Sequence, residues 1–563
     1  MTGNMSASPT ALLITNFDEI DRAIASLHSH RDRWVETNIP QRLAYLQDCL
    51  DRTVDIAEDW ANAGCEAKGI DPKSTLAGEE WITGPIATVR NIRLLMNTLQ
   101  ANGQLPPPKI SRRPDGQVVA EILPANLIDQ MLYLGYRAEV WLKLEKTPTQ
   151  GQIYREQTAG KVGLILGAGN VSSIVATDVL SKLFSENQIV IVKMNPVNAY
   201  IGEYLVQAFA PLIQAGFLHI VYGGIAVGEY LCQHSQLEVI HITGSHLTHD
   251  AIVWGTTTRE QQERKAANRP RLTKPITSEL GCVTPILVVP GKWSKSDLTF
   301  QARQVASTIS NNASFNCVSG QILVTASGWP QQAEFLAAVR RELAAIPPRP
   351  AYYPGAQDRY QAFLDQYPQS EALGTRTPEI VPWTIIPDVP PVAGEYALTE
   401  EAFCGILAQV SIESDSAPDF LAKAVDFVNE GVWGTLSCTV LIDPSTQKQY
   451  HHELDTAIAN LKYGAIGVNI WSGMLFYFGS TTWGAYPGNT IADIGSGTGF
   501  VHNSYLFDHP QKSVVYAPFR IFPTPAWFAN HKNLLNMAKQ LLKLEANPTW
   551  KNLPLVVLAA LRG

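Results

Sequence analysis

Among the seven cysteines of this 563-residue chain, Cys317 stands in a setting that suits chemistry. It ends the polar stretch NNASFNC, and the sequence VSGQILV, with a glycine and an apolar strand, follows it. These neighbours place the Cys317 thiol at the edge of a loop. Isolated cysteines are more often small buried apolar residues, and we interpret five others in that way: Cys49, Cys65, Cys232, Cys404 and Cys438. Cys317 is therefore the candidate nucleophile.

A second candidate is Asn170, which closes the turn GAGN at residues 167–170. The turn follows an apolar strand and opens a helix, and glycine tolerates the tight geometry of such a turn. The Asn170 amide could donate a hydrogen bond to a developing oxyanion. An ordinary strand-to-helix turn with Asn170 as the helix N-cap explains the pattern equally well.

Two further segments end predicted strands with groups suited to a ligand. Lys193 closes the run QIVIVK, at the strand end where open α/β sheets bind ligands, and could contact a ribose or phosphate. Gly244 and Ser245 follow the strand EVIHIT, where backbone N–H groups can approach a pyrophosphate. A solvated lysine and a common turn are the alternatives.

The elements that must position these residues alternate along the chain. Apolar strands are predicted over 161–166 and 188–193, in HIVYGG near 219–224, and in EVIHITGS at 238–245, with helices between them. This alternation is typical of a parallel, doubly wound sheet. A second α/β region is expected from 276 to 467. Helical periodicity covers about 16–100, and two alternating runs around a glycine turn predict a β-hairpin over 140–156.

Composition excludes several classes of protein. The net charge of −8 and pI near 5.9 disfavour nucleic acid as a main partner. The odd number of cysteines, without a CxxC pair, predicts neither a disulfide framework nor a metal site. No signal peptide is evident at the N-terminus, and the apolar run 553–561 is too short to span a bilayer. We expect a cytoplasmic protein without a membrane partner.

Taken together and in order, these segments resemble the aldehyde dehydrogenase superfamily, over roughly residues 130–500. The matching series is Asn170, Lys193, Thr243-Gly244-Ser245, Glu279-Leu280-Gly281-Cys282, Asn312-x-x-x-x-Cys317, Glu401-Ala402-Phe403 and a Gly/aromatic tail with Val468-Asn469 and Trp483-Gly484-Ala485-Tyr486.

The resemblance implies an α/β fold: a doubly wound Rossmann-like cofactor domain, a second α/β catalytic domain and a small β oligomerisation element. The expected division is an N-terminal helical part at 1–135, an oligomerisation hairpin at 136–158, the dinucleotide-binding domain at 159–275 and the catalytic domain at 276–467. Residues 468–563 would form a loop that returns to the cofactor domain, and then a tail. A homodimer or homotetramer is expected on the same analogy.

The resemblance also implies a mechanism with NAD or NADP as cofactor and an aldehyde as substrate. The Cys317 thiolate would attack the aldehyde, and the Asn170 amide with the Cys317 backbone N–H would stabilise the oxyanion. After hydride transfer, Glu279 would activate water to hydrolyse the thioester. Lys193, Gly244 and Ser245 would contact the cofactor, and the Glu401–Phe403 segment would hold its nicotinamide ribose.

Departures from the family pattern leave alternatives open. GAGN replaces the usual P-W-N, Cys282 replaces the second glycine of E-L-G-G with no role assigned to it, and Ser314-Phe315 replaces the Gly-Gln before the nucleophile. Pro196 stands where NAD users often have a ribose-binding acid, which leaves NADP open. Two alternatives to hydrolytic aldehyde oxidation remain: a CoA-acylating aldehyde dehydrogenase, and a non-catalytic binding or structural member of the fold. The aromatic residues Trp471, Phe476, Tyr477 and Trp483 are candidates for lining a substrate tunnel.

Overall fold

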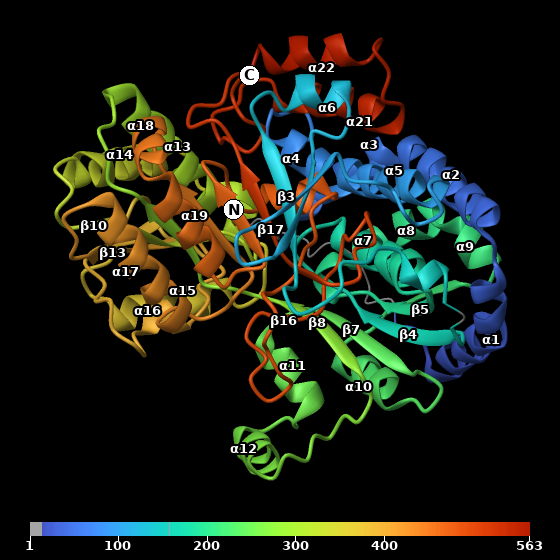
Figure 1. The fold of residues 1–563 in the computed structure, drawn as a ribbon. Coiled ribbons are helices and arrows are strands. Elements are labelled where there is room, and N and C mark those ends of the chain that lie inside the picture. Colours follow the sequence, from blue (N-terminus) through green and yellow to red (C-terminus); the bar gives the residue numbers. More distant parts are fainter. Residues whose placement is uncertain (1–13, 157) are drawn as a thin grey trace, which may run out of the picture.

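The structure is a computed structural model that describes residues 14–156 and 158–563. Two β-sheets form its centre, one of six strands and one of eleven, and helices cover both (Figure 1). Each sheet has its own hydrophobic core, and the larger core belongs to the eleven-stranded sheet. The predicted fold class is therefore confirmed.

Residues 17–100 are mainly helical, as predicted, and pack on the smaller sheet. The helical part expected over 1–135 is wrong beyond residue 100, because β1 (Lys109–Arg112) and β2 (Val118–Leu123) belong to the eleven-stranded sheet. Helix α1 starts after Asn16, whose side chain accepts from the Glu19 N–H, and α2 starts with a capping box at Asn38. Their apolar faces carry the buried Trp34 and Leu46 into the core. The helices are α1 (Phe17–Glu36), α2 (Ile39–Asp55), α3 (Ala57–Ala67), α4 (Ala77–Trp81) and α5 (Ala87–Gln100).

The six-stranded sheet has the order β16-β8-β7-β4-β5-β6, and all its neighbouring strands are parallel except β16 and β8. Its strands are β4 (Lys161–Leu166), β5 (Gln188–Lys193), β6 (Leu218–Val221), β7 (Val239–Gly244), β8 (Ile276–Leu280) and β16 (Gly497–Thr498). The helices between them are α7 (Ile174–Leu180), α8 (Gly202–Ala208), α9 (Ala210–Gln214), α10 (Ile225–Gln233), α11 (His246–Val253) and α12 (Thr258–Ala266). The four predicted strands and their parallel pairing are confirmed.

Strand β8 corrects the expected boundary at residue 276. It pairs in parallel with β7, with Ile276 opposite Ile240, and so extends the cofactor-type sheet through Leu280. After β8 the chain passes to the eleven-stranded sheet with β9 (Thr284–Val288). Both strands are short, and the sequence alone gives no sign of which neighbour each will pair with.

The eleven-stranded sheet has the order β1-β2-β3-β17-β15-β14-β9-β10-β13-β12-β11, with a parallel centre. Its strands are β1 (Lys109–Arg112), β2 (Val118–Leu123), β3 (Arg137–Leu142), β9 (Thr284–Val288), β10 (Gly320–Ala326), β11 (Glu371–Ala372), β12 (Thr384–Ile386), β13 (Ile406–Ile412), β14 (Ser437–Leu441), β15 (Ala465–Val468) and β17 (Pro510–Tyr516). The accompanying helices are α13 (Lys295–Ser310), α14 (Gln332–Ala344), α15 (Ala356–Gln366), α16 (Tyr396–Thr399), α17 (Ala417–Glu430), α18 (Pro444–Gln449), α19 (His451–Asn460) and α20 (Met474–Phe478).

The hairpin expected over 140–156 is wrong. Strand β3 pairs on one side with β2 and on the other with β17, both antiparallel, so no edge remains for the segment that follows it. That segment instead contacts the C-terminal part of the chain through a bridge between Gln150 and Phe507. Strand β3 (Arg137–Leu142) shares only residues 140–142 with the predicted hairpin, and its partners lie elsewhere in the sequence.

The C-terminal residues return to the N-terminal helices. Helix α21 (Leu534–Ala546) packs against α4 and α5, and its Glu545 forms buried ion pairs with Arg90 and Arg93. Helix α22 (Leu553–Ala560) packs on α21, next to α6 (Leu127–Leu132), at the outer edge of the molecule (Figure 1).

Candidate active site

The eight predicted site residues line one cavity of about 860 Å³. Part of its wall comes from the carboxyl ends of β4, β5 and β7, where parallel strands end together, and helices α10 and α11 add to it. The loop that carries Cys317 also lines the cavity. The eight residues are Asn170, Lys193, Gly244, Ser245, Glu279, Cys317, Glu401 and Phe403.

The thiol of Cys317 faces the carboxylate of Glu279. Its Sγ lies 3.8 Å from Glu279 Oε1, at the limit of a sulfur hydrogen bond. The same oxygen accepts a hydrogen bond from the Trp483 indole at 2.8 Å. Glu279 comes from the end of β8 and Trp483 from the C-terminal loops, so three distant segments meet here.

Burial determines the protonation of this pair. It raises the pKa of Glu279 to about 7, and the nearby Asp178 adds to the rise, whereas the hydrogen bonds from Trp483 and Cys317 oppose it. The pKa of Cys317 is raised well above its ordinary value by burial and by the carboxylates of Glu279 and Glu401. At neutral pH the thiol is therefore protonated, and Glu279 is the group placed to accept its proton.

The loop before Cys317 makes an unusual turn. Asn312, Ala313 and Ser314 are consecutive residues with positive φ angles of 51°, 54° and 71°. Each non-glycine residue in this region costs on the order of 1 kcal/mol or more, so surrounding contacts must hold the turn. The Ser314 hydroxyl supplies one of them by donating to the Cys404 carbonyl at 2.9 Å.

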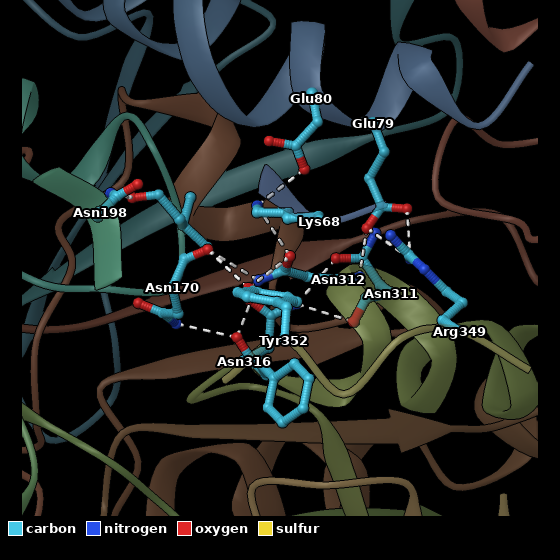
Figure 2. Close-up of polar contacts among 12 residues, drawn as sticks. Lys68, Glu79, Glu80, Asn170, Asn198, Asn311, Asn312, Asn316, Arg349 and Tyr352 are labelled. Carbon is cyan, nitrogen blue, oxygen red and sulfur yellow. Dashed lines mark hydrogen bonds and ion pairs between the residues drawn. The ribbon is translucent and has the colours of Figure 1, made fainter. Parts of the chain in front are cut away.

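Asn312 is the centre of those contacts (Figure 2). Its Nδ2 donates to the carbonyl oxygens of Asn170 at 3.1 Å and Phe315 at 2.9 Å. Its Oδ1 accepts from Lys68 Nζ at 3.0 Å and from the Tyr352 hydroxyl at 3.0 Å. One side chain thus joins the turn after β4 to the loop of Cys317.

Two acidic residues of α4 complete this network (Figure 2). Glu80 pairs with the buried Lys68 at 2.8 Å. Burial disfavours the ammonium of Lys68 and is the largest single effect, but the charge and hydrogen bond of Glu80 together with Tyr200 and Glu79 outweigh it, and the pKa of Lys68 lies above its ordinary value. Glu79 accepts from the Asn312 backbone N–H and pairs with Arg349 at 2.9 Å. Sequence reasoning missed Lys68, Glu79 and Glu80, which carry no local motif.

The side chain of Asn170 is hydrogen-bonded to the loop that carries Cys317. Its Nδ2 donates to the Phe315 carbonyl at 3.1 Å, which leaves the second N–H of the amide for the cavity. The helix that follows starts with Ser173 as its N-cap, so the alternative in which Asn170 caps the helix is wrong.

Glu401 and Phe403 form the wall beside Gly281. The Cys282 backbone N–H donates to Glu401 at 3.3 Å, and burial raises the pKa of the Glu401 carboxyl to about 7, against the effect of that bond and of Arg359. Arg359 donates to the Phe403 carbonyl at 3.2 Å and so fixes this segment. A side chain at Gly281 would overlap the Glu401 carboxylate, which explains the glycine.

Cys282 points away from the cavity. It is fully buried, and its thiol lies 3.9 Å from the Ser437 carbonyl. Its carbonyl accepts from the Gln321 side chain at 2.9 Å. These contacts give Cys282 a packing role at the start of the second sheet.

The part of the cavity beside Lys193 is shaped for an extended anionic ligand. Burial lowers the pKa of Lys193. Gly224 and Gly228 line the same region, and a Cβ at either position would meet no atom within 4 Å. A Cβ at Gly244 would meet none within 3.4 Å. This room above the strand ends, with the N-terminus of α11 and its cap Ser245 beside it, fits a dinucleotide.

The four aromatic residues that sequence analysis proposed for a substrate tunnel are mostly core residues. Trp471 and Trp483 are buried, and the Trp471 indole donates to the Val318 carbonyl at 2.9 Å. Tyr477 packs against the core, and its pKa is raised by burial and by charges that include Cys317. Trp483 holds the carboxylate of Glu279 instead.

Comparison with known proteins agrees with this geometry. The family model described as the aldehyde dehydrogenase family matches residues 14–353. No curated protein sequence matches the chain significantly. Solved structures with the same fold include an NADP-dependent glyceraldehyde-3-phosphate dehydrogenase from Bacillus halodurans complexed with NADP, with 15% identity and a TM-score of 0.60 over 90% of this chain and 92% of that one.

Two other solved structures show the same likeness. A gamma-glutamyl-gamma-aminobutyraldehyde dehydrogenase from Burkholderia cenocepacia has 16% identity and a TM-score of 0.62 over 90% of both chains. AldH of Staphylococcus aureus has 14% identity and a TM-score of 0.60 over 91% of this chain and 96% of that one. These identities establish the shared fold, and the family model covers more than half of the sequence. The chain therefore belongs to the aldehyde dehydrogenase family.

Proposed function

We propose that this protein oxidises an aldehyde to a carboxylic acid with NAD or NADP, using Cys317 as nucleophile and Glu279 as general base. The observation that carries the proposal is the contact of 3.8 Å between the Cys317 thiol and a buried carboxylate whose pKa is about 7. A base with a pKa near the working pH combines a useful deprotonated fraction with enough basicity to take a proton.

In the first step Glu279 takes the thiol proton while Sγ bonds to the aldehyde carbon. The carbonyl oxygen becomes an oxyanion, for which the free N–H of Asn170 and the Cys317 backbone N–H are the proposed donors. One such donor is worth about 3–4 kcal/mol in acyl-transfer enzymes. The Asn312 network supports both donors because it ties the Asn170 and Phe315 carbonyls together.

The cavity beside Lys193, Gly244 and Ser245 would hold the dinucleotide, with Glu401 and Phe403 next to its nicotinamide ribose. Bound there, the nicotinamide supplies the hydride acceptor. The thioester left on Cys317 is then hydrolysed. Glu279 first releases the thiol proton to solvent. It then removes a proton from water, whose oxygen bonds to the carbonyl carbon as the bond to Sγ breaks, and it passes that proton to Sγ to restore the thiol. Glu279 Oε2 is buried and has no hydrogen-bond partner within the described residues, which suits this second use.

The two alternatives make different demands on Glu279. A CoA-acylating enzyme passes the acyl group to a thiol and does not need a base for water, so the preserved contact between Glu279 and Cys317 favours hydrolysis. A non-catalytic member of the fold would have no need for the trio Asn170, Glu279 and Cys317 at one cavity.

For the assembly we propose a homodimer or homotetramer. The division of the chain is proposed as before, with the end of the dinucleotide-binding part moved past β8 and with β1 and β2 assigned to the part built on the eleven-stranded sheet. Strand β3 lies between two partners, so an intersubunit contact through the 136–158 region would use its loops. Strand β1, which lies outside that region, offers an exposed edge for such a contact.

The deciding experiment follows the formation of NADH or NADPH by absorbance at 340 nm. It uses a panel of aliphatic and aromatic aldehydes, each with NAD and with NADP, in the presence and in the absence of CoA. We expect turnover without CoA that Cys317→Ala abolishes and that Cys49→Ala, a buried cysteine in α2, leaves intact. Turnover that requires CoA would establish the acylating alternative. Absence of turnover together with absence of nucleotide binding by calorimetry would establish the non-catalytic one.

A further inference from the structure

The outer surface of α22 is apolar where a water-facing helix is normally polar. Leu555, Leu558 and Leu561 are 47%, 53% and 50% exposed, and their spacing of three residues places them on one face. The opposite face, with Leu553 and Val556, is buried against the cluster that includes Leu544. The helix is therefore packed on one side and has no partner within the described residues on the other.

Helix α6 extends this surface. Its Ile128 and Leu132 pack against the same buried cluster, so α6 and α22 are neighbours (Figure 1). Leu127, Met131 and Leu134 are exposed on α6 and just after it. The carboxylate of Asp129, in the first turn of α6, accepts a hydrogen bond from the Ala125 N–H. We call the exposed residues Leu127, Met131, Leu134, Trp550, Leu555, Leu558 and Leu561 the apolar face.

The C-terminal segment that carries α22 is rich in basic residues. Seven of the 43 Lys and Arg residues but one of the 51 acidic residues lie in 510–563, which gives this segment a formal charge of +6 and the remainder −14. The one acid, Glu545, is buried between Arg90 and Arg93. Lys551 and Arg562 are exposed on either side of α22.

We propose that the apolar face docks this protein on the surface of a bilayer that contains anionic lipids. Apolar side chains enter the boundary of headgroups and acyl chains, Trp550 lies at the interface, and Lys551 and Arg562 face the lipid phosphates. The described helices include none long and apolar enough to cross a membrane, so the contact is peripheral. This proposal departs from the sequence-based expectation of no membrane partner.

Charge also selects the bilayer over a second copy of the chain. A twofold contact brings the same surface of both copies together, and here it would place Lys551 and Arg562 of both copies in one interface. Like charges that meet at an interface are unfavourable. An anionic bilayer satisfies the apolar face and the cations together.

The test is flotation of the full-length protein with vesicles of phosphatidylcholine alone or mixed with phosphatidylglycerol. We expect binding to the mixed vesicles that weakens with salt and falls at least about tenfold in the double variant Leu555→Asp/Leu558→Asp. Lys551→Glu/Arg562→Glu should remove most of the preference for anionic lipid. Val392→Asp, at a residue as exposed as Leu558 but distant in sequence, is the matched control and should bind like the wild type.

Melting temperature and sedimentation velocity accompany the flotation, so that unfolding is not mistaken for loss of docking. All substituted positions are exposed, and we expect native melting temperatures. Equal flotation of the wild type and the leucine double variant would overturn the proposal, as would no binding to anionic vesicles at low salt. Self-association that the leucine double variant abolishes, without lipid binding, would identify the face as an interface between copies and would also overturn it.

Discussion

The ammonium of Lys68 lies 3.0 Å from the Oδ1 of Asn312, although 244 residues separate the two in the sequence. Lys68 follows α3 and Asn312 opens the left-handed turn before Cys317. The contact makes the N-terminal helices part of the machinery that positions the nucleophile. We treat Lys68 as a positioning residue, because it touches the loop and not the cavity.

Replacing Lys68 with methionine should both destabilise the protein and loosen the loop. It leaves Glu80 buried without its cation, which typically costs about 3–5 kcal/mol. Urea unfolding measures the loss. The double variant Lys68→Met/Glu80→Gln removes both charges and should recover most of the stability. If it also recovers the wild-type rate of Cys317 alkylation by iodoacetamide, the contact with Asn312 does not position the loop.

The exposed pair Lys539–Glu58 provides the control for that experiment. Its nitrogen–oxygen distance of 2.7 Å is close to the 2.8 Å between Lys68 and Glu80, but both of its side chains are exposed. Lys539→Met should change the free energy of unfolding by about 1 kcal/mol or less, because exposed ion pairs contribute little. It should leave the alkylation rate unchanged.

The rate of acylation should rise with pH through a midpoint near 7. Glu279 accepts the thiol proton only as a carboxylate, and its pKa of about 7 means that this form is lost as the pH falls below neutrality. The burst of reduced cofactor measured from pH 5.5 to 8.5 gives the midpoint. Glu279→Gln should lower the rate by roughly 10²–10⁴-fold and remove the inflection. An inflection near 7 that survives in this variant would assign it to another group.

Trp483→Phe should move that midpoint to higher pH. The indole donates to Glu279 Oε1 at 2.8 Å and stabilises the charged form. A hydrogen bond to a charged group contributes about 1.5–3 kcal/mol, which corresponds to roughly one to two pH units. Trp471→Phe is the matched control, because its indole donates to the Val318 carbonyl and not to a carboxylate. The same midpoint in both variants would show that Trp483 does not tune Glu279.

Sequence patterns predicted the elements better than their partners. The strands over 161–166 and 188–193 were predictable because each is a short apolar run bounded by turns. The position of the site at their carboxyl ends could be predicted as well, because parallel strands end at one edge of the sheet. The pairing of β8 and β3 depends on long-range contacts, which a run of five or six residues does not encode. The order of motifs predicted Glu279 and Cys317 as site residues, and the structure places both at one cavity. Lys68, Glu79 and the bond from Trp483 join segments hundreds of residues apart and leave no local pattern.

Gly228 offers a direct test of the dinucleotide cavity. It lies within α10 and lines the cavity, and a Cβ there would meet no atom within 4 Å. Gly228→Phe should therefore fill the space and weaken NAD(P) binding, measured by calorimetry, while the melting temperature stays at or above that of the wild type. Gly228→Ala is the control. It adds only a methyl group and should stabilise the helix by up to about 1 kcal/mol without changing affinity. If Gly228→Phe binds the cofactor as tightly as the wild type, the dinucleotide does not occupy this part of the cavity, and the roles assigned to Lys193 and Ser245 fail with it.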